Sequence, residues 1–258
     1  MFSIENGVWK VKKESIKDLF VFISSFVLYY IFGTGLIYLI LRTIYDSNSA
    51  LFPSYLSNED FLERGLSNIA QLISSFLILI ILVVIYFRSL RKHFSFLKDY
   101  KLVLKTIGYA LLVYFVTICY NLFLPLAGGT GEDGSNVALI KESMKQQYWL
   151  MFTLVVILGP FVEEFLFRFV PFKAMKENIS RAWLLSITSV LFTIPHMFSL
   201  ISSTDLMGDL LALPKFLIVG WMLGSYYYKN NDIGRVILVH MLYNIISFVL
   251  MSVSLALV

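Results

Sequence analysis

The chain has 258 residues, of which 58% are hydrophobic and only 15% are charged. Together with a mean hydropathy of +0.77, this composition excludes a soluble globular domain and indicates a membrane protein. The formal net charge of +4 does not require a nucleic-acid partner, because the lysines and arginines gather in alternate loops. The single cysteine, Cys119, excludes an intrachain disulfide framework and a cysteine-rich metal site.

Apolar stretches near the length of about 20 residues that a membrane-spanning helix needs recur along the chain. They cover residues 19–41, 66–87, 106–126, 146–162, 182–204, 216–228 and 236–258. The sixth stretch is short, so its helix must begin near Leu210, with Lys215 reaching towards the lipid headgroups. We therefore predict an all-α, polytopic membrane helix bundle of about seven spans.

The bundle is predicted to be a single membrane domain, residues 1–258, because no linker of low complexity and no convincing internal repeat divides it. Its first three spans and their loops occupy residues 1–145, and a C-terminal core occupies residues 146–258. The first stretch follows four lysines as a secretory signal would, but it is longer than a signal h-region of about 7 to 15 residues. We expect it to be retained as an anchor.

The loops predict the orientation of the bundle. If the N-terminus is cytoplasmic, the basic residues of segments 10–17, 88–105 and 173–181 all fall on the inner side, together with Lys229 and Arg235. Only five basic loop residues then fall outside, namely Arg42, Arg64, Lys141, Lys145 and Lys215. The positive-inside rule therefore places the N-terminus in the cytoplasm.

Strongly polar side chains are rare within the apolar stretches, away from their ends. They are Glu163, Glu164 and Arg168 around the end of the fourth stretch, His196 in the fifth, and His240 and Asn244 in the seventh. An ionisable side chain inside a bilayer costs about 2.5 kcal/mol or more, so such residues usually mark function. At a helical rise of about 1.5 Å per residue, the carboxylates, histidines and Asn244 lie about 8 to 20 Å from the cytoplasmic helix ends. A shared cavity in the cytoplasmic half is therefore feasible.

Helical geometry divides the adjacent carboxylates. Glu163 and Glu164 differ by about 100° around a helix, so both cannot point the same way. Glu164 stands four residues before Arg168 and is expected to meet it, while Glu163 faces the cavity. Mutual neutralisation could also be the whole role of Glu164 and Arg168. His240 and Asn244 share one helix face.

Prolines accompany two of these sites. Pro160 stands three residues before Glu163, and Pro195 directly precedes His196. Each proline removes a helical hydrogen bond and releases a carbonyl one turn earlier, which tends to kink the helix. Separately, Gly220 and Gly224 predict close helix packing in the sixth span.

The motifs now have an order: Glu163-Glu164-x-x-x-Arg168, Phe192-x-x-x-His196 and His240-x-x-x-Asn244. This order resembles the CPBP family of intramembrane proteases, which joins the type II CAAX prenyl endopeptidases to the bacterial Abi proteins. The resemblance covers roughly residues 146–254 and implies an intramembrane endopeptidase. The implied roles are a catalytic carboxylate for Glu163, support from Glu164, organisation of the carboxylates by Arg168, binding of the same water by His196, and an oxyanion site from His240 and Asn244.

The chemistry leaves alternatives open. A zinc site from Glu163, His196 and His240 is conceivable, but the chain lacks His-Glu-x-x-His, so we favour a glutamate mechanism without a cofactor. A non-catalytic membrane chaperone or bacteriocin-immunity protein would keep the fold and tolerate loss of Glu163. A transporter would use the buried charges as a relay, yet repeated broken spans are lacking.

The expected partners are membrane lipid and a peptide or membrane-protein substrate, for which the resemblance allows lipidation; no nucleic acid is expected. Small size, residue usage and the positive-inside bias point to a bacterial plasma membrane.

Overall fold

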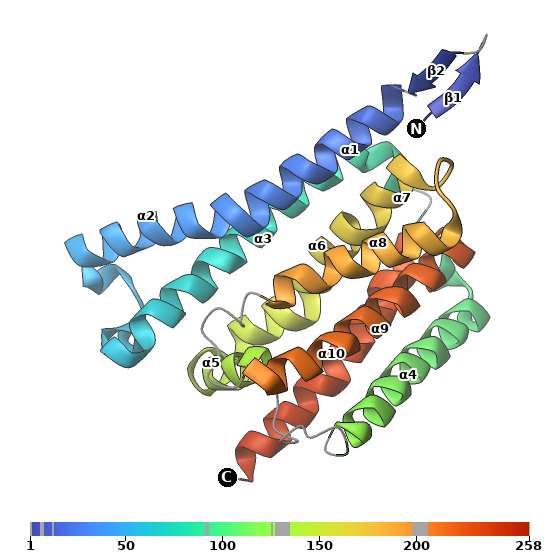
Figure 1. Cartoon of the computed structure of the whole chain (residues 1–258). Helices are drawn as coiled ribbons and strands as arrows, with labels where there is room; N and C mark the ends of the chain where they lie inside the picture. The colour runs from blue at the N-terminus through green and yellow to red at the C-terminus, as the bar shows by residue number, and fades with distance from the viewer. Residues whose placement is uncertain are drawn as a thin grey trace.

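The computed structural model describes residues 2–5, 8–11, 13–90, 93–124, 126, 135–197 and 206–257. Helices make up nearly all of this part of the chain (Figure 1). An antiparallel hairpin of β1 (Phe2–Glu5) and β2 (Val8–Val11) precedes them, which the basic N-terminal sequence did not predict. The predicted class, a polytopic membrane helix bundle, is confirmed.

Six helices of the described chain are long and apolar enough to cross a membrane. They are Ser15–Ser47, Phe61–Leu90, Tyr100–Phe123, Asn136–Met175, Leu206–Asn230 and Ile233–Ala256. The fifth predicted stretch corresponds to α8 (Arg181–Thr193), which has 13 residues and is too short to span by itself. A 3₁₀ turn at 194–197 extends it, and residues 198–204 of that stretch lie outside the described part. The count of seven and the cytoplasmic N-terminus stay predictions.

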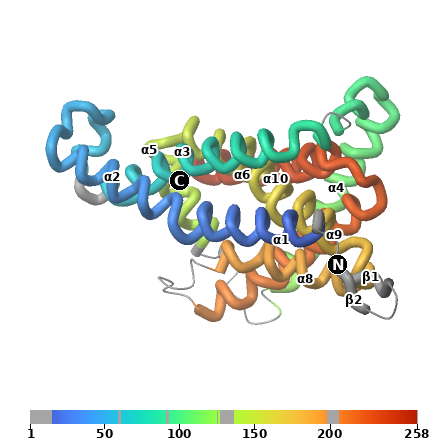
Figure 2. The backbone as a smooth tube through the Cα atoms, turned by 90° about the horizontal axis from the view of Figure 1, so that it is seen from above, coloured from blue at the N-terminus to red at the C-terminus, as the bar shows by residue number. Residues whose placement is uncertain are grey.

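The N-terminal spans form a long helix pair along one flank of the bundle (Figures 1 and 2). The first member consists of α1 (Lys13–Phe26), the π-helical segment η1 (Val27–Gly33) and α2 (Thr34–Ser47). Two short 3₁₀ segments, η2 (Ser49–Leu51) and η3 (Ser54–Ser57), lead into the second member, α3 (Glu59–Leu90). Hydroxyl pairs join them, Tyr29 with Ser75 at 2.8 Å and Thr34 with Ser74 at 2.9 Å.

The C-terminal core begins with a winding span in which α-helical and π-helical segments alternate. In order these are α5 (Ser135–Phe152), η6 (Thr153–Leu158), α6 (Gly159–Glu164), η7 (Phe165–Phe169) and α7 (Val170–Met175). Around Pro160, the span carries π-helical segments on both sides of α6. Such segments are rare and frequently mark functional sites.

The remaining helices enclose this span. The 3₁₀ segment η4 (Ser95–Lys98) leads into α4 (Tyr100–Phe123), which packs on α10 (Ile233–Ala256); α8 packs on α9 (Leu206–Asn230). A Cβ atom on Gly220 would lie 3.0 Å from the Cα of Ser189, and one on Gly224 would lie 3.1 Å from Leu185 Cδ2. The predicted close packing at these glycines is therefore confirmed, and it joins α9 to α8.

Gln147 interrupts α5 with a non-helical backbone (φ −119°, ψ 42°). Its side chain accepts a hydrogen bond from Asn68 Nδ2 at 2.7 Å and donates to the Tyr55 hydroxyl at 2.9 Å. The interruption thus ties α5 to α3 and η3.

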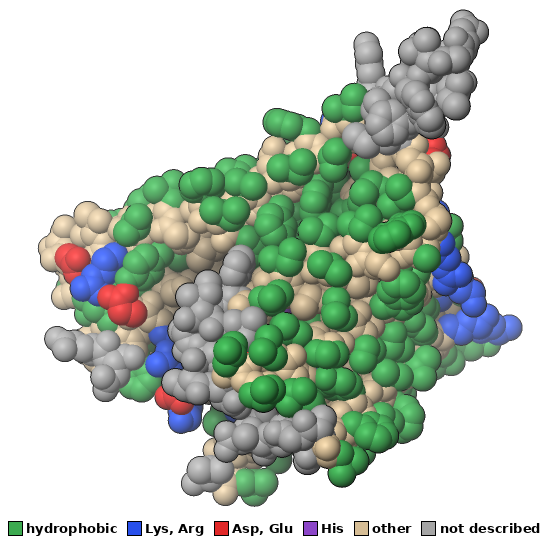
Figure 3. Space-filling view, viewed as in Figure 1, with side chains coloured by type: hydrophobic (Ala, Val, Ile, Leu, Met, Phe, Trp, Pro, Cys, Tyr) green, Lys and Arg blue, Asp and Glu red, His purple; other side chains and the backbone are tan. Residues whose placement is uncertain are grey.

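Apolar side chains cover most of the face seen in Figure 3, and lysines and arginines gather towards its edges. Large hydrophobic residues that are exposed include Phe20, Val84, Phe115 and Trp149. A lipid-facing surface accounts for them, because hydrocarbon tails solvate what water would not.

Candidate active site

A buried ion pair lies at the centre of the C-terminal core. Arg168 Nη1 donates to Glu164 Oε1 at 2.8 Å, and both side chains are 0% exposed. His240 Nδ1, on α10, lies 2.7 Å from the same oxygen. An ionised carboxylate only accepts hydrogen bonds, so Nδ1 carries the hydrogen and Nε2 is the atom presented to the rest of the site. The contact expected between Glu164 and Arg168 is present, and His240 joins it.

Arg168 also links three elements. Its Nη2 donates to the carbonyl oxygen of Gly220 on α9 at 3.2 Å, and its guanidinium lies 4.3 Å from the ring centroid of Phe192 on α8. Glycine at position 220 lets the α9 backbone approach this closely. The planar, multidentate guanidinium suits such a junction better than a lysine ammonium would.

Glu163 has a different environment from its neighbour. Its side chain is 20% exposed, and its Oε2 lies 3.7 Å from His240 Nε2, which is too long for a hydrogen bond. Within the described residues, no donor hydrogen-bonds to the Glu163 carboxylate. His240 therefore bridges the two carboxylates, with one ring nitrogen bonded to Glu164 and the other facing Glu163.

Pro195 explains the setting of His196. The 3₁₀ turn at 194–197 pairs each carbonyl with the N–H three residues later, and for Phe192 that residue is a proline without a donor. His196 Nδ1 supplies the missing hydrogen bond to Phe192 O at 2.9 Å. The imidazole also packs on Phe216, with ring centroids 4.2 Å apart. In the neutral ring this leaves Nε2 as the acceptor.

Pro160 explains the hydrogen bond of Asn244 in the same way, because it also leaves a carbonyl without its helical N–H donor. In the π-helical register of η6, the N–H of Gly159 bonds to Leu154 O, so the next carbonyl, that of Val155, would need the N–H that Pro160 lacks. Asn244 Nδ2 donates to Val155 O at 2.8 Å instead. One of the two amide hydrogens implied as oxyanion donors is therefore used to hold α10 against η6.

These groups meet at one cavity of about 580 Å³. Glu163, His196, His240 and Asn244 all line it, while Glu164 and Arg168 lie buried behind them. The structure thus brings together every site residue expected from the sequence.

Sequence reasoning missed many contributors to the wall, among them Tyr30 of η1 and Phe216 of α9. Aromatic residues are common in apolar spans, so no sequence signal distinguishes these two.

The alternative zinc site can be compared with the donor groups that the structure places here. The described part of the chain has no group of three His, Cys, Asp or Glu side chains that could hold an ion. In the alternative zinc set, His240 directs Nδ1 at Glu164 and His196 directs Nδ1 at a backbone carbonyl. Metal-binding histidines make the same bonds through the ring nitrogen that does not ligate, so metal analysis and chelation are the test of this alternative.

Comparison with known proteins finds one family model that matches the C-terminal core. Residues 145–246 match the model of the family described as type II CAAX prenyl endopeptidase Rce1-like, which confirms the predicted resemblance. The match contains all six expected site residues and runs from α5 into α10; α1 to α4 lie outside it. Neither curated proteins nor solved structures give a match.

Proposed function

We propose that this chain, whose residues 145–246 match the model of the type II CAAX prenyl endopeptidase Rce1-like family, hydrolyses a peptide bond within the membrane with Glu163 as the base. The match supports an intramembrane protease of the CAAX type at family level. The observation that carries the finer proposal is the division of the carboxylates. Glu164 is committed to Arg168 and His240, whereas Glu163 faces the cavity without a hydrogen bond from the described residues.

In the proposed reaction, one water donates its two hydrogens to Glu163 and to His196 Nε2, and its lone pair points at the scissile carbonyl. Glu163 takes a proton as the water oxygen bonds to the carbonyl carbon. The C–N bond then breaks, and the proton held by Glu163 passes to the departing amine. The balance is one water consumed, with a carboxyl and an amine formed. His196 is suited to its part because its Nδ1 already bonds to Phe192 O.

The developing oxyanion would be stabilised by His240 Nε2–H and the second amide hydrogen of Asn244. This role requires hydrogen on both ring nitrogens of His240, because Nδ1–H is already directed at Glu164 Oε1. Glu164 and Arg168 thus act through His240 and not on the substrate. This mechanism uses no metal, a choice supported by the lack of a group of three His, Cys, Asp or Glu side chains placed to hold an ion among the described residues.

The proposed substrate is a peptide or membrane protein in the lipid phase of a bacterial plasma membrane. A cavity of about 580 Å³ lies in the range that holds a compact ligand, and so has room for a short extended segment. Its wall combines the polar residues of the site with Phe192 and Phe216.

The test compares membranes containing wild type, Glu163→Gln and the control Glu63→Gln, which changes an exposed carboxylate on α3 that is 64% exposed. New peptide termini are identified by mass spectrometry. We expect products with wild type and Glu63→Gln, and a loss of at least about 10³-fold with Glu163→Gln at unchanged melting temperature. Retained cleavage by folded Glu163→Gln would end the assignment of the base.

Two further outcomes separate the alternatives. A chaperone or immunity protein would give the same termini in all three membranes and keep its biological effect in Glu163→Gln. A metalloprotease would lose activity with a chelator and contain stoichiometric metal, whereas we expect activity to persist after chelation.

A further inference from the structure

Tyr30 has an unusual hydroxyl. It lies on η1, outside the family match, and its oxygen is buried with no hydrogen-bond partner among the described residues. A buried polar group without a partner destabilises the folded state, so its presence needs a reason. Its neighbour Tyr29 is different, because the Tyr29 hydroxyl bonds to Ser75 on α3 at 2.8 Å.

Aromatic neighbours fix the Tyr30 ring. Ring centroids lie 5.0 Å away for Phe26, 4.6 Å for Tyr29 and 6.1 Å for Phe167. Phe167 in turn packs edge-on against Phe192 at 5.7 Å, the ring that carries the Arg168 guanidinium. The position of the hydroxyl is therefore set by packing around the site, and not by a hydrogen bond of its own.

A complementary group lies in the same cavity wall. Tyr30 and Glu163 both line the cavity. Among the described residues, no donor hydrogen-bonds to the Glu163 carboxylate and the Tyr30 hydroxyl has no hydrogen-bond partner. Closure around a bound segment would pair the two groups, and apo hydrogen bonds of active sites often tighten when the substrate binds.

We propose that, with substrate in the cavity, the Tyr30 hydroxyl donates a hydrogen bond to the Glu163 carboxylate and holds it in line with the hydrolytic water. Tyr30 is then a positioning residue supplied by the N-terminal helix pair. This rests on the proposed function of Glu163. It also gives η1 a purpose, because both of its adjacent tyrosines line the cavity but only the Tyr29 hydroxyl is bonded to α3, which leaves the Tyr30 hydroxyl for the site.

The experiment uses the full chain in liposomes and a quenched fluorescent peptide copied from a cleavage site that wild type produces and Glu163→Gln does not. Tyr30→Phe removes the hydroxyl and keeps the ring; Tyr29→Phe is the matched control. Rates are expressed per folded molecule. We expect Tyr30→Phe to lower kcat about 10- to 100-fold, as for a slightly misplaced reacting group, with KM within twofold. Tyr29→Phe should keep kcat within twofold and lower the melting temperature.

The other possible results contradict either the role of Tyr30 or the proposed function of Glu163. An unchanged kcat in Tyr30→Phe, or an equal fall in both phenylalanine variants, removes the positioning role and leaves Glu163 as the base. If Tyr30→Phe changes KM and leaves kcat as in wild type, Tyr30 contributes to substrate binding and the proposal is contradicted. Cleavage products that do not differ between wild type and Glu163→Gln remove the proposed function itself, and this inference with it.

Discussion

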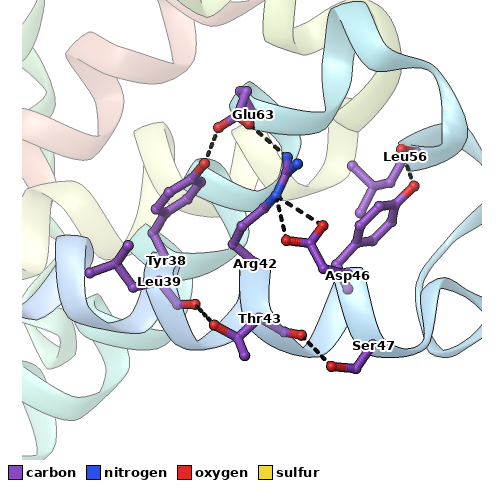
Figure 4. A network of polar contacts seen from close by, with 9 residues as sticks. Tyr38, Leu39, Arg42, Thr43, Asp46, Ser47, Leu56 and Glu63 are labelled. Atoms are coloured by element: carbon purple, nitrogen blue, oxygen red, sulfur yellow. Dashed lines mark hydrogen bonds and ion pairs between the residues drawn. The ribbon is translucent and has the colours of Figure 1, made fainter.

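Two arginines in this protein each pair with an acidic side chain four residues away along the same span. Arg168 bonds to Glu164 at the centre of the C-terminal core. Arg42, at the far end of the N-terminal helix pair, lies 3.1 Å from Asp46 and 2.7 Å from Glu63 of α3 (Figure 4). The sequence pattern is similar, but the surroundings are opposite.

Exposure separates the inner cluster, Arg168 with Glu164, from the outer cluster, Arg42 with Asp46 and Glu63. Arg168 and Glu164 are 0% exposed, whereas Arg42 is 34% exposed, Asp46 56% and Glu63 64%. Water and salt screen the outer cluster, so its pairs contribute little. In the inner cluster, removing one member leaves a buried charge without compensation. Helical spacing alone therefore predicts a contact but not its energetic weight.

Arg168→Met gives the largest effect we expect from this comparison. It leaves Glu164 with His240 alone and removes the hydrogen bond to Gly220 O. Loss of one partner of a buried pair costs about 3 to 5 kcal/mol. Thermal unfolding in detergent should show a large decrease in melting temperature, and peptide cleavage should be lost with it.

The matched control is the double variant Glu164→Gln with Arg168→Met. Removing both charges relieves the uncompensated carboxylate, so the double variant should be more stable than Arg168→Met alone. If Arg168→Met unfolds like wild type, the pair is not a buried electrostatic unit and the comparison fails.

The spacing of Glu164 and Arg168 was enough to predict their contact, because both lie on one helix. Hydropathy likewise predicted most of the spans, and the two glycines of α9 predicted its close packing on α8. These features depend on residues near one another in sequence. The division between Glu163 and Glu164 also follows from helical angle alone.

Contacts between helices far apart in sequence could not be derived in the same way. The bond from His240 Nδ1 to Glu164 depends on how α10 packs on α6 and η7. The two prolines predicted released carbonyls, but not that Asn244 and His196 would bond to them. Nothing in the sequence indicated that Tyr30 would reach the site, because the N-terminal spans carry no matching motif.

Asp232, between α9 and α10, is intermediate in side-chain exposure between the two arginine clusters. Its carboxylate caps α10 by accepting from Gly234 N–H and lies 3.5 Å from His93 Nδ1. Burial by itself would raise the pKa of Asp232, but His93 and the N–H groups of Gly234 and Arg235 outweigh it, so the pKa lies below its usual value of about 3.9. Asp232→Ala should cost about 0.5 to 2 kcal/mol through the lost cap.

Asp232→Asn isolates the charge, because asparagine caps as well as aspartate does. A depressed pKa stabilises the folded state above the unfolded pKa, and this contribution disappears as pH falls through the folded value. The melting temperatures of wild type and Asp232→Asn should therefore differ at pH 5 and converge below about pH 4. A difference that grows on acidification would contradict this sign.

The smallest effect is expected for Arg42→Ala. The substitution removes contacts to Asp46 and Glu63, while the Tyr38 hydroxyl keeps its hydrogen bond to Glu63. Exposed pairs pay for their geometry with side-chain entropy and are screened by salt, so the melting temperature should change by no more than about 2 °C. Cleavage should stay at the wild-type rate. The cluster lies where α2 ends and α3 begins, and it contributes no residue to the cavity wall. A decrease approaching that of Arg168→Met would show that the outer cluster is held in a less solvated environment than its exposure indicates, and that burial does not separate the two arginines.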